Sequence, residues 1–100
     1  RISNNLYEAL KGAEFVYVKN WSSYKEYGEV YPVSENWMMD NKKLQQTNDA
    51  KVMHCLPVRR DLELSSEILD GPNSLVIQEA GNRVWAAQVV LKKMLENLNK

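Results

Sequence analysis

A thiol, an imidazole and two guanidinium groups lie close together in the stretch Met53-His54-Cys55-Leu56-Pro57-Val58-Arg59-Arg60. The residues Lys51-Val52-Met53 that lead into it form a short apolar run, typical of the end of a buried strand. Pro57 cannot donate a ladder hydrogen bond and biases Leu56 away from helical geometry, so we expect the chain to leave the sheet here. In open α/β sheets, ligands bind at the carboxyl ends of the strands. The stretch therefore predicts a site for an anionic substrate that carries carboxylate or phosphate.

The elements that must position these groups alternate between helix and strand. Apolar spacing and capping residues predict helices over 4–11 (closed by Gly12), within 34–46, over 65–69 (capped by Ser65) and over about 82–97. Continuous apolar runs predict strands at Phe15–Val18, covered on both faces, at Lys51–Cys55 and at Ser74–Ile77. We expect a loop over 22–32 and buried side chains at Trp37, Met38 and Leu44. This alternation needs crossover connections and predicts an α/β fold with a parallel sheet.

Composition narrows the class of protein. One hundred residues suffice for one small domain, and 13 basic residues balance 13 acidic ones, which argues against a nucleic-acid-binding face. The single cysteine excludes an internal disulfide and fits a reducing compartment, so we expect a cytoplasmic protein. No apolar run approaches the roughly 20 residues of a membrane helix, and no signal peptide is evident. One His next to one Cys does not make a metal site, because structural zinc sites need four ligands.

Two motifs carry a resemblance to a known family. His54-Cys55-Leu56-Pro57 resembles a signature of the aspartate/ornithine carbamoyltransferase family, and the continuation Val58-Arg59-Arg60 looks like the branch that carbamoylates N-acylated ornithine. Downstream, Gln78-Glu79-Ala80-Gly81-Asn82-Arg83-Val84-Trp85 resembles the family's second signature, in which Glu-Asn-Arg leads into a helix. Gly81 stands in place of the usual Glu, a departure that leaves the Arg unchanged. The motifs occur in the family's order, and the resemblance extends along the whole chain.

The resemblance implies a place in a larger enzyme. Residues 1–80 would be part of the second, amino-acid-binding domain of a two-domain carbamoyltransferase, and 81–100 a final helix that returns to the carbamoyl-phosphate domain. The chain begins at Arg1 without a methionine, so we expect it to be the carboxyl-terminal portion of the enzyme, inactive by itself. The family's Ser-Thr-Arg-Thr phosphate loop does not occur in it. The family needs no cofactor or metal and forms homotrimers with shared sites.

The resemblance also assigns roles to individual residues. Cys55 would be the catalytic residue, and Cys55, Leu56 and Arg83 would contact carbamoyl phosphate, with direct transfer and no covalent intermediate on the thiol. Arg59 would meet the carboxylate of the acceptor, whereas Arg60 is expected to be structural or exposed. His54 is a further candidate, which by sequence alone we interpret as satisfying a backbone group. For Arg83 there is an independent argument, because the predicted first turn of a helix after a strand attracts anions.

Lys19 is the departure that bears on the acceptor. Ornithine carbamoyltransferases resemble this segment but carry an Asp at this position, followed by a Ser-Met-Gly loop, and that Asp pairs with the free α-ammonium of ornithine. Here a cation replaces the anion, and like charges repel. Lys19 and Arg59 together therefore favour N-succinylornithine or N-acetylornithine as the acceptor. The alternatives are an ordinary ornithine carbamoyltransferase and, from another class, a non-catalytic α/β binding or regulatory module.

Overall fold

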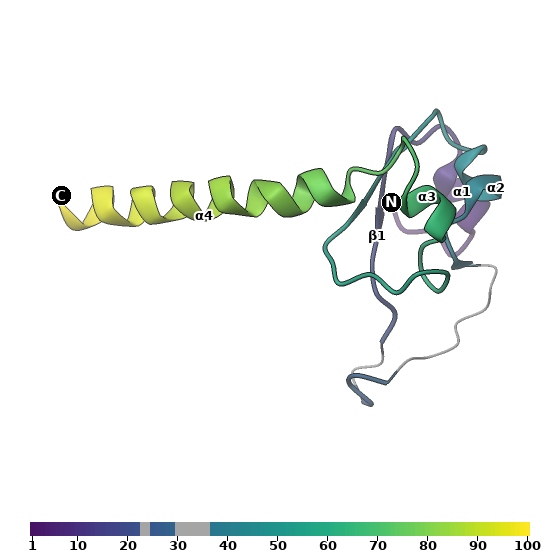
Figure 1. Ribbon diagram of the computed structural model, residues 1–100, viewed down its shortest axis with the longest axis horizontal. Helices are drawn as coiled ribbons and strands as arrows, with labels where there is room; N and C mark the ends of the chain where they lie inside the picture. The colour runs from purple at the N-terminus through teal and green to yellow at the C-terminus, as the bar shows by residue number, and fades with distance from the viewer. Residues whose placement is uncertain (23–24, 30–36) are drawn as a thin grey trace.

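The computed structural model of the chain describes residues 1–22, 25–29 and 37–100. Its elements follow in the order α1 (Leu6–Leu10), β1 (Phe15–Val18), α2 (Asn41–Leu44), β2 (Lys51–His54), α3 (Ser66–Leu69) and α4 (Val76–Leu98). The three short helices gather with the strands into one body, from which α4 extends as a long rod (Figure 1). The predicted α/β class is confirmed.

The sheet pairs β1 and β2 in parallel, with Val16 opposite Val52 and Val18 opposite His54. Gly12, with φ of 73°, ends α1 in the left-handed conformation and directs the chain into β1. Val16 and Val18 pack against the buried cluster, whereas Phe15 and Tyr17 are 64% and 48% exposed. The prediction that β1 is covered on both faces is wrong, because the cluster lies on the Val16 side alone.

The predicted third strand at Ser74–Ile77 is also wrong. The segment runs beside β2 for one step, where the Val52 N–H donates to Asn73 O and the Leu75 N–H donates to Val52 O, each at 2.8 Å. At the next residue α4 begins, and the Glu79 N–H donates to Leu75 O at 2.8 Å. Strand pairing is therefore limited to a single bridge between Val52 and Ser74, and the sheet of the described residues has two strands.

The helix predicted within 34–46 shrinks to α2, and residues 34–36 lie outside those described. Met39 is extended instead: its N–H donates to Glu63 O at 3.0 Å, and its carbonyl accepts from Ser65 N at 2.9 Å. Met39 is consequently the buried residue, whereas the predicted Met38 and Leu44 are half-buried and Trp37 is 44% exposed. Of the loop predicted over 22–32, the described residues 22 and 25–29 are in neither helix nor strand.

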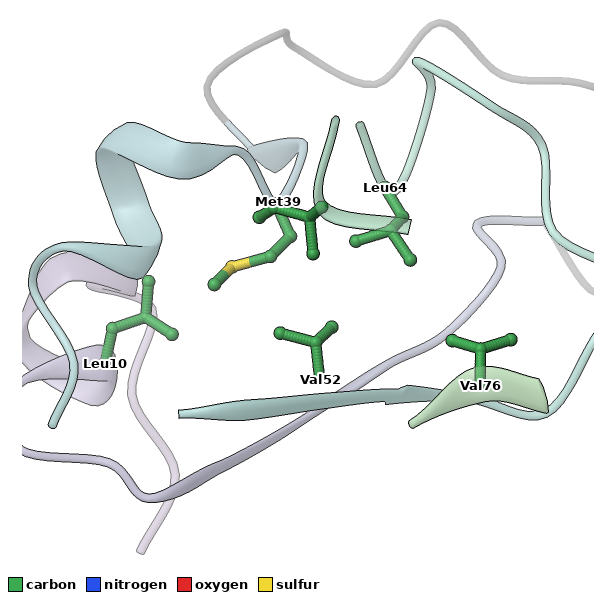
Figure 2. Close-up of a cluster of buried hydrophobic side chains, with 6 residues drawn as sticks. Leu10, Met39, Val52, Leu64 and Val76 are labelled. Carbon is green, nitrogen blue, oxygen red and sulfur yellow. The ribbon is translucent and has the colours of Figure 1, made fainter. Parts of the chain in front are cut away.

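The buried cluster joins side chains from α1, β2, α3, α4 and the segments before α2 and α3. It consists of Leu10, Met39, Val52, Leu64, Ile68 and Val76. Figure 2 shows the labelled side chains converging from α1, β2, the start of α4 and the segments that flank them. Ser65 caps α3 as predicted, since its hydroxyl accepts from Ile68 N at 3.3 Å. The cluster therefore holds β2, and with it the stretch that follows β2, against the helices.

Beyond its first turns, α4 is not covered by the described part of the chain, and every residue from 81 to 100 is exposed. Its predicted apolar stripe is present but uncovered, with Val84, Leu91 and Met94 57–60% exposed. On its other side, Lys92 and Glu96 form an ion pair at 3.8 Å. Among the described residues, no helix has the length and apolar character needed to cross a membrane.

Candidate functional site

The carboxyl ends of β1 and β2 bring two of the predicted site residues together. The register that pairs Val18 with His54 sets the next residues, Lys19 and Cys55, side by side at the same edge of the sheet. The Lys19 ammonium donates to Cys55 Sγ at 3.6 Å. Lys19 is exposed and Cys55 half-buried, so both groups can meet a ligand at this edge. A cation beside a thiol, open to solvent, is suited to a carboxylate or phosphate ligand.

His54 lies beneath this edge, completely buried. Its Nδ1 accepts the Leu56 N–H at 2.9 Å, so the ring proton is assigned to Nε2, which lies 3.0 Å from Asn20 Oδ1. The Asn20 amide in turn donates to Pro57 O at 3.0 Å. The imidazole thus satisfies a backbone group, as the sequence predicts. Through Asn20 it also ties the end of β1 to the segment after β2.

Leu56 adopts an unusual backbone conformation, with φ of 58°, and precedes a cis peptide bond to Pro57. A bulky residue at positive φ is uncommon and is tolerated where its surroundings hold it. The hydrogen bond from its N–H to His54 is one such restraint. His54 therefore helps to set the course of the chain just after Cys55.

Burial lowers the pKa of His54, and this effect outweighs the attraction of its protonated form to Glu63 and Glu79. A histidine with a depressed pKa stays neutral in the folded protein at a pH where the unfolded chain already binds a proton. We therefore expect its stabilising contribution to be present above about pH 6.5 and to be lost as the pH falls below that value.

The measurement is the free energy of unfolding of the full-length protein across about pH 5 to 8. His54→Asn keeps an acceptor for the Leu56 N–H but cannot titrate, so the loss of stability on the acid side should become smaller in this variant. An acid-side slope that the substitution leaves unchanged would contradict the assignment to His54.

The two arginines after Pro57 have separate surroundings. Arg60 is exposed and forms a two-point ion pair with Asp70, at 2.7 and 2.8 Å, in agreement with the expected structural role. Arg59 is half-buried, and its guanidinium makes a long hydrogen bond of 3.5 Å to the Trp21 carbonyl. Because Trp21 is two residues beyond Lys19, Arg59 lies by the same end of β1 as the lysine.

Glu79, in the first turn of α4, ties this helix to the sheet. Its carboxylate accepts the His54 N–H at 3.1 Å. It also accepts a hydrogen bond from the Tyr17 hydroxyl, and this bond, with partial desolvation and the negative charge of Glu79, raises the pKa of Tyr17 to about 12. Tyr17 therefore stays protonated. The hydrogen bond between Glu79 and His54 fixes the start of α4 next to the end of β2.

Arg83 lies at a different position in its helix from the one that the sequence predicts. Since α4 starts at Val76 and not near Asn82, Arg83 is the eighth residue of the helix and lies beyond its first turn. The free N–H groups and the helix dipole that favour anions at a helix start are therefore not available to it. It shares a helix face with Glu79, four residues earlier, and is exposed, without a hydrogen bond to the other site residues in the described structure.

A match to a known protein family identifies the chain. Residues 1–94 match the family described as "Aspartate/ornithine carbamoyltransferase, Asp/Orn binding domain". The chain belongs to this family. The predicted family is thereby confirmed, and the match covers nearly the whole chain.

Individual relatives refine the likeness. The N-succinylornithine carbamoyltransferase of Bacteroides fragilis is 42% identical to this chain over 100 residues, covering 98% of the chain and 31% of the relative. The N-acetylornithine carbamoyltransferase of Xylella fastidiosa is 31% identical over 97 residues, covering 91% and 29%. A solved ornithine carbamoyltransferase from Burkholderia thailandensis has a TM-score of 0.75 at 30% identity, covering 92% and 29%. The chain spans less than a third of the length of these relatives.

The polar residues that support the site, half-buried Asn20 and Glu79 and completely buried Glu63, were not predicted as site residues from the sequence. Asn20 and Glu79 bind His54 from the end of β1 and from α4, and Glu63 approaches its Nε2 at 3.7 Å. A Glu between two Leu residues, as in Leu62-Glu63-Leu64, reads from sequence like an ordinary surface carboxylate. Within residues 1–22, 25–29 and 37–100, no three His, Cys, Asp or Glu side chains are grouped to hold a metal ion.

Proposed function

We propose that the full-length protein transfers the carbamoyl group of carbamoyl phosphate to the δ-amine of an N-acylornithine, with N-succinylornithine as first choice and N-acetylornithine as second. The observation that carries the proposal is Lys19, whose ammonium lies 3.6 Å from Cys55 Sγ. A cation at this place would repel the α-ammonium of free ornithine. An acylated α-nitrogen is neutral and leaves only carboxylates to pair with Lys19 and Arg59.

In the proposed reaction the neutral δ-amine attacks the carbamoyl carbon. A carbon–nitrogen bond forms, the bond to the phosphate oxygen breaks, the amine loses a proton and phosphate leaves. The protein's contribution is positioning and charge complementarity. Cys55 and the Leu56 carbonyl would contact the carbamoyl group, Arg83 the carbamoyl phosphate, and Arg59 with Lys19 the carboxylates of the acceptor. Cys55 positions the reacting groups and does not form a covalent intermediate.

The same proposal extends to the pathway, the cellular location and the assembly of the enzyme. The names of the relatives support a role in arginine biosynthesis, where carbamoylated acylornithine would be consumed. By resemblance to the family, the protein would be a cytoplasmic homotrimer in which neighbouring subunits share sites, and α4 would return to the carbamoyl-phosphate domain. The division into 1–80 and 81–100 stays a prediction.

The test is a panel of acceptors offered to the full-length protein with carbamoyl phosphate. We expect turnover of N-succinylornithine or N-acetylornithine, with free ornithine disfavoured by about one to two decades in kcat/KM, the value of a charge-assisted hydrogen bond. Formation of the carbamoylated product is measured directly. Turnover of ornithine alone would support the ordinary ornithine enzyme, and binding without turnover of any acceptor would support a regulatory module.

Lys19→Asp is the variant that isolates the charge argument within this panel. It should lower kcat/KM for the acylated acceptor by about one decade or more, without necessarily creating activity on ornithine, since the Ser-Met-Gly loop would still be missing. Lys19→Arg, which keeps the cation, is the matched control. Equal activity of the Asp and Arg variants on the acylated acceptor would contradict the role of Lys19.

A further inference from the structure

The carboxyl group of Glu63 is completely buried, a costly location for a titratable group that has to be offset by its contacts. Its Oε1 accepts the Arg59 N–H at 2.9 Å and lies 3.7 Å from His54 Nε2. Its Oε2 has no hydrogen-bond partner in the described structure. The bond to Arg59 is thus the principal hydrogen bond that this side chain makes.

The backbone around Arg59 shows why an outside acceptor is needed. In the tight turn from Arg59 to Leu64, the Leu62 N–H donates to Arg59 O at 3.3 Å and the Asp61 N–H donates to Leu64 O at 2.9 Å. These bonds leave the Arg59 N–H to the side chain of Glu63. A backbone N–H away from water requires a partner. Glu63 supplies this acceptor with a side chain that is held in a completely buried position.

Glu63 is itself fixed from the side of the core. Its own carbonyl accepts from Met39 N at 3.0 Å, and its neighbour Leu64 is fully buried in the cluster. The contact between Glu63 and Arg59 therefore runs from the packed core to the segment that carries the guanidinium. The Arg60 side chain is instead paired with the exposed Asp70 on the surface.

We infer that Glu63 is a positioning residue for acceptor binding: by accepting the Arg59 N–H from a fully buried site, it holds the segment from which Arg59 reaches the acceptor's carboxylate. This inference rests on the proposed function for the identity of the acceptor. It assigns Glu63 no contact with either substrate. Its main effect is expected on the acceptor, because its hydrogen bond goes to Arg59, whereas Leu56 is held by His54 Nδ1, the ring nitrogen that Glu63 does not approach.

The experiment compares Glu63→Leu with Glu63→Gln in the full-length protein. Gln keeps an oxygen for the Arg59 N–H, whereas Leu has a similar shape and no acceptor. We expect the acceptor KM to rise about tenfold in the Leu variant and to change less than about threefold in the Gln variant. The KM for carbamoyl phosphate should stay within about twofold in both. Ile68→Ala, a core substitution, is the control for lost stability alone.

Hydrogen exchange of the Arg59 backbone amide is the second readout, and it does not depend on activity. It should be faster in Glu63→Leu than in the wild type or in Glu63→Gln. Unchanged exchange, or an equal rise of both KM values, or a KM pattern that Ile68→Ala reproduces, would overturn the inference. Absence of transfer to any N-acylornithine by the wild type would refute the proposed function and the acceptor role, while exchange at Arg59 would still decide whether Glu63 holds it.

Discussion

Replacing Arg59 with Ala in the full-length protein is expected to raise the acceptor KM about ten- to one-hundred-fold, corresponding to the 1.5–3 kcal/mol of a hydrogen bond to a charged group. Arg59 is half-buried, and its guanidinium reaches the Trp21 carbonyl beside the end of β1, where Lys19 adds a second cation. A carboxylate placed between them would lose one of two charged partners. Steady-state kinetics with N-succinylornithine and N-acetylornithine measure the change.

The neighbouring guanidinium is a close control. Arg60 is held by Asp70 in an exposed ion pair, which contributes little to stability in water. Arg60→Ala should therefore leave the acceptor KM within about threefold of the wild type. If Arg60→Ala weakened acceptor binding as much as Arg59→Ala, the effect would belong to the positive charge of the segment as a whole, and the assignment of Arg59 would be wrong.

Leu64→Ala is expected to lower the free energy of unfolding by about 2–5 kcal/mol, the usual result of truncating a buried Leu. Leu64 is completely buried, and Figure 2 shows it facing Met39 and Val52 at the centre of the cluster. Single domains are stable by only about 5–15 kcal/mol. One substitution would thus remove a large share of the stability and loosen β2, together with the site residues that follow it.

The measurement is urea unfolding of the full-length protein, with Leu62→Ala as the control. Leu62 is half-buried and lies outside the cluster, so its truncation should cost clearly less. Equal destabilisation by the two substitutions would show that the cluster is not what holds this part of the fold. Kinetics on the Leu64 variant at low temperature would separate lost stability from lost chemistry.

The sequence by itself determined the features that depend on neighbouring residues. The short apolar runs before Lys19 and Cys55 specify strands, and the polar residues that end them specify where a parallel sheet presents its chemistry. Ser65 and Gly12 delimit helices through local hydrogen bonding and backbone conformation. Those rules act within a few residues, so the strands, the caps and the polar residues at the strand ends could be predicted from the sequence, and the motifs indicated the family. The register that sets Lys19 beside Cys55 is a tertiary feature.

Tertiary contacts decided where α4 begins. The apolar run from Ser74 to Ile77 is short enough for either a strand or a helix, and periodicity cannot choose between them. The choice follows from Val52, which pairs with the segment once, and from Glu79, whose carboxylate binds the His54 N–H from the first helical turn. With the helix starting at Val76, Arg83 is displaced from the helix end at which the sequence had placed it.

Tertiary structure also decided which polar residues are buried. His54 and Glu63 are completely buried, Asn20 is half-buried, and the three come from separate segments. Asn20 and Glu63 resemble surface residues in their own sequence context, whereas His54 was expected to satisfy a backbone group. Burial becomes favourable only when the segments meet, because each side chain then forms a hydrogen bond with a backbone group of another part of the site. Asn20 donates to the Pro57 carbonyl, His54 accepts the Leu56 N–H and Glu63 accepts the Arg59 N–H. Local patterns indicate which residues can do the chemistry, but the residues that hold them in place can be recognised only from the packed fold.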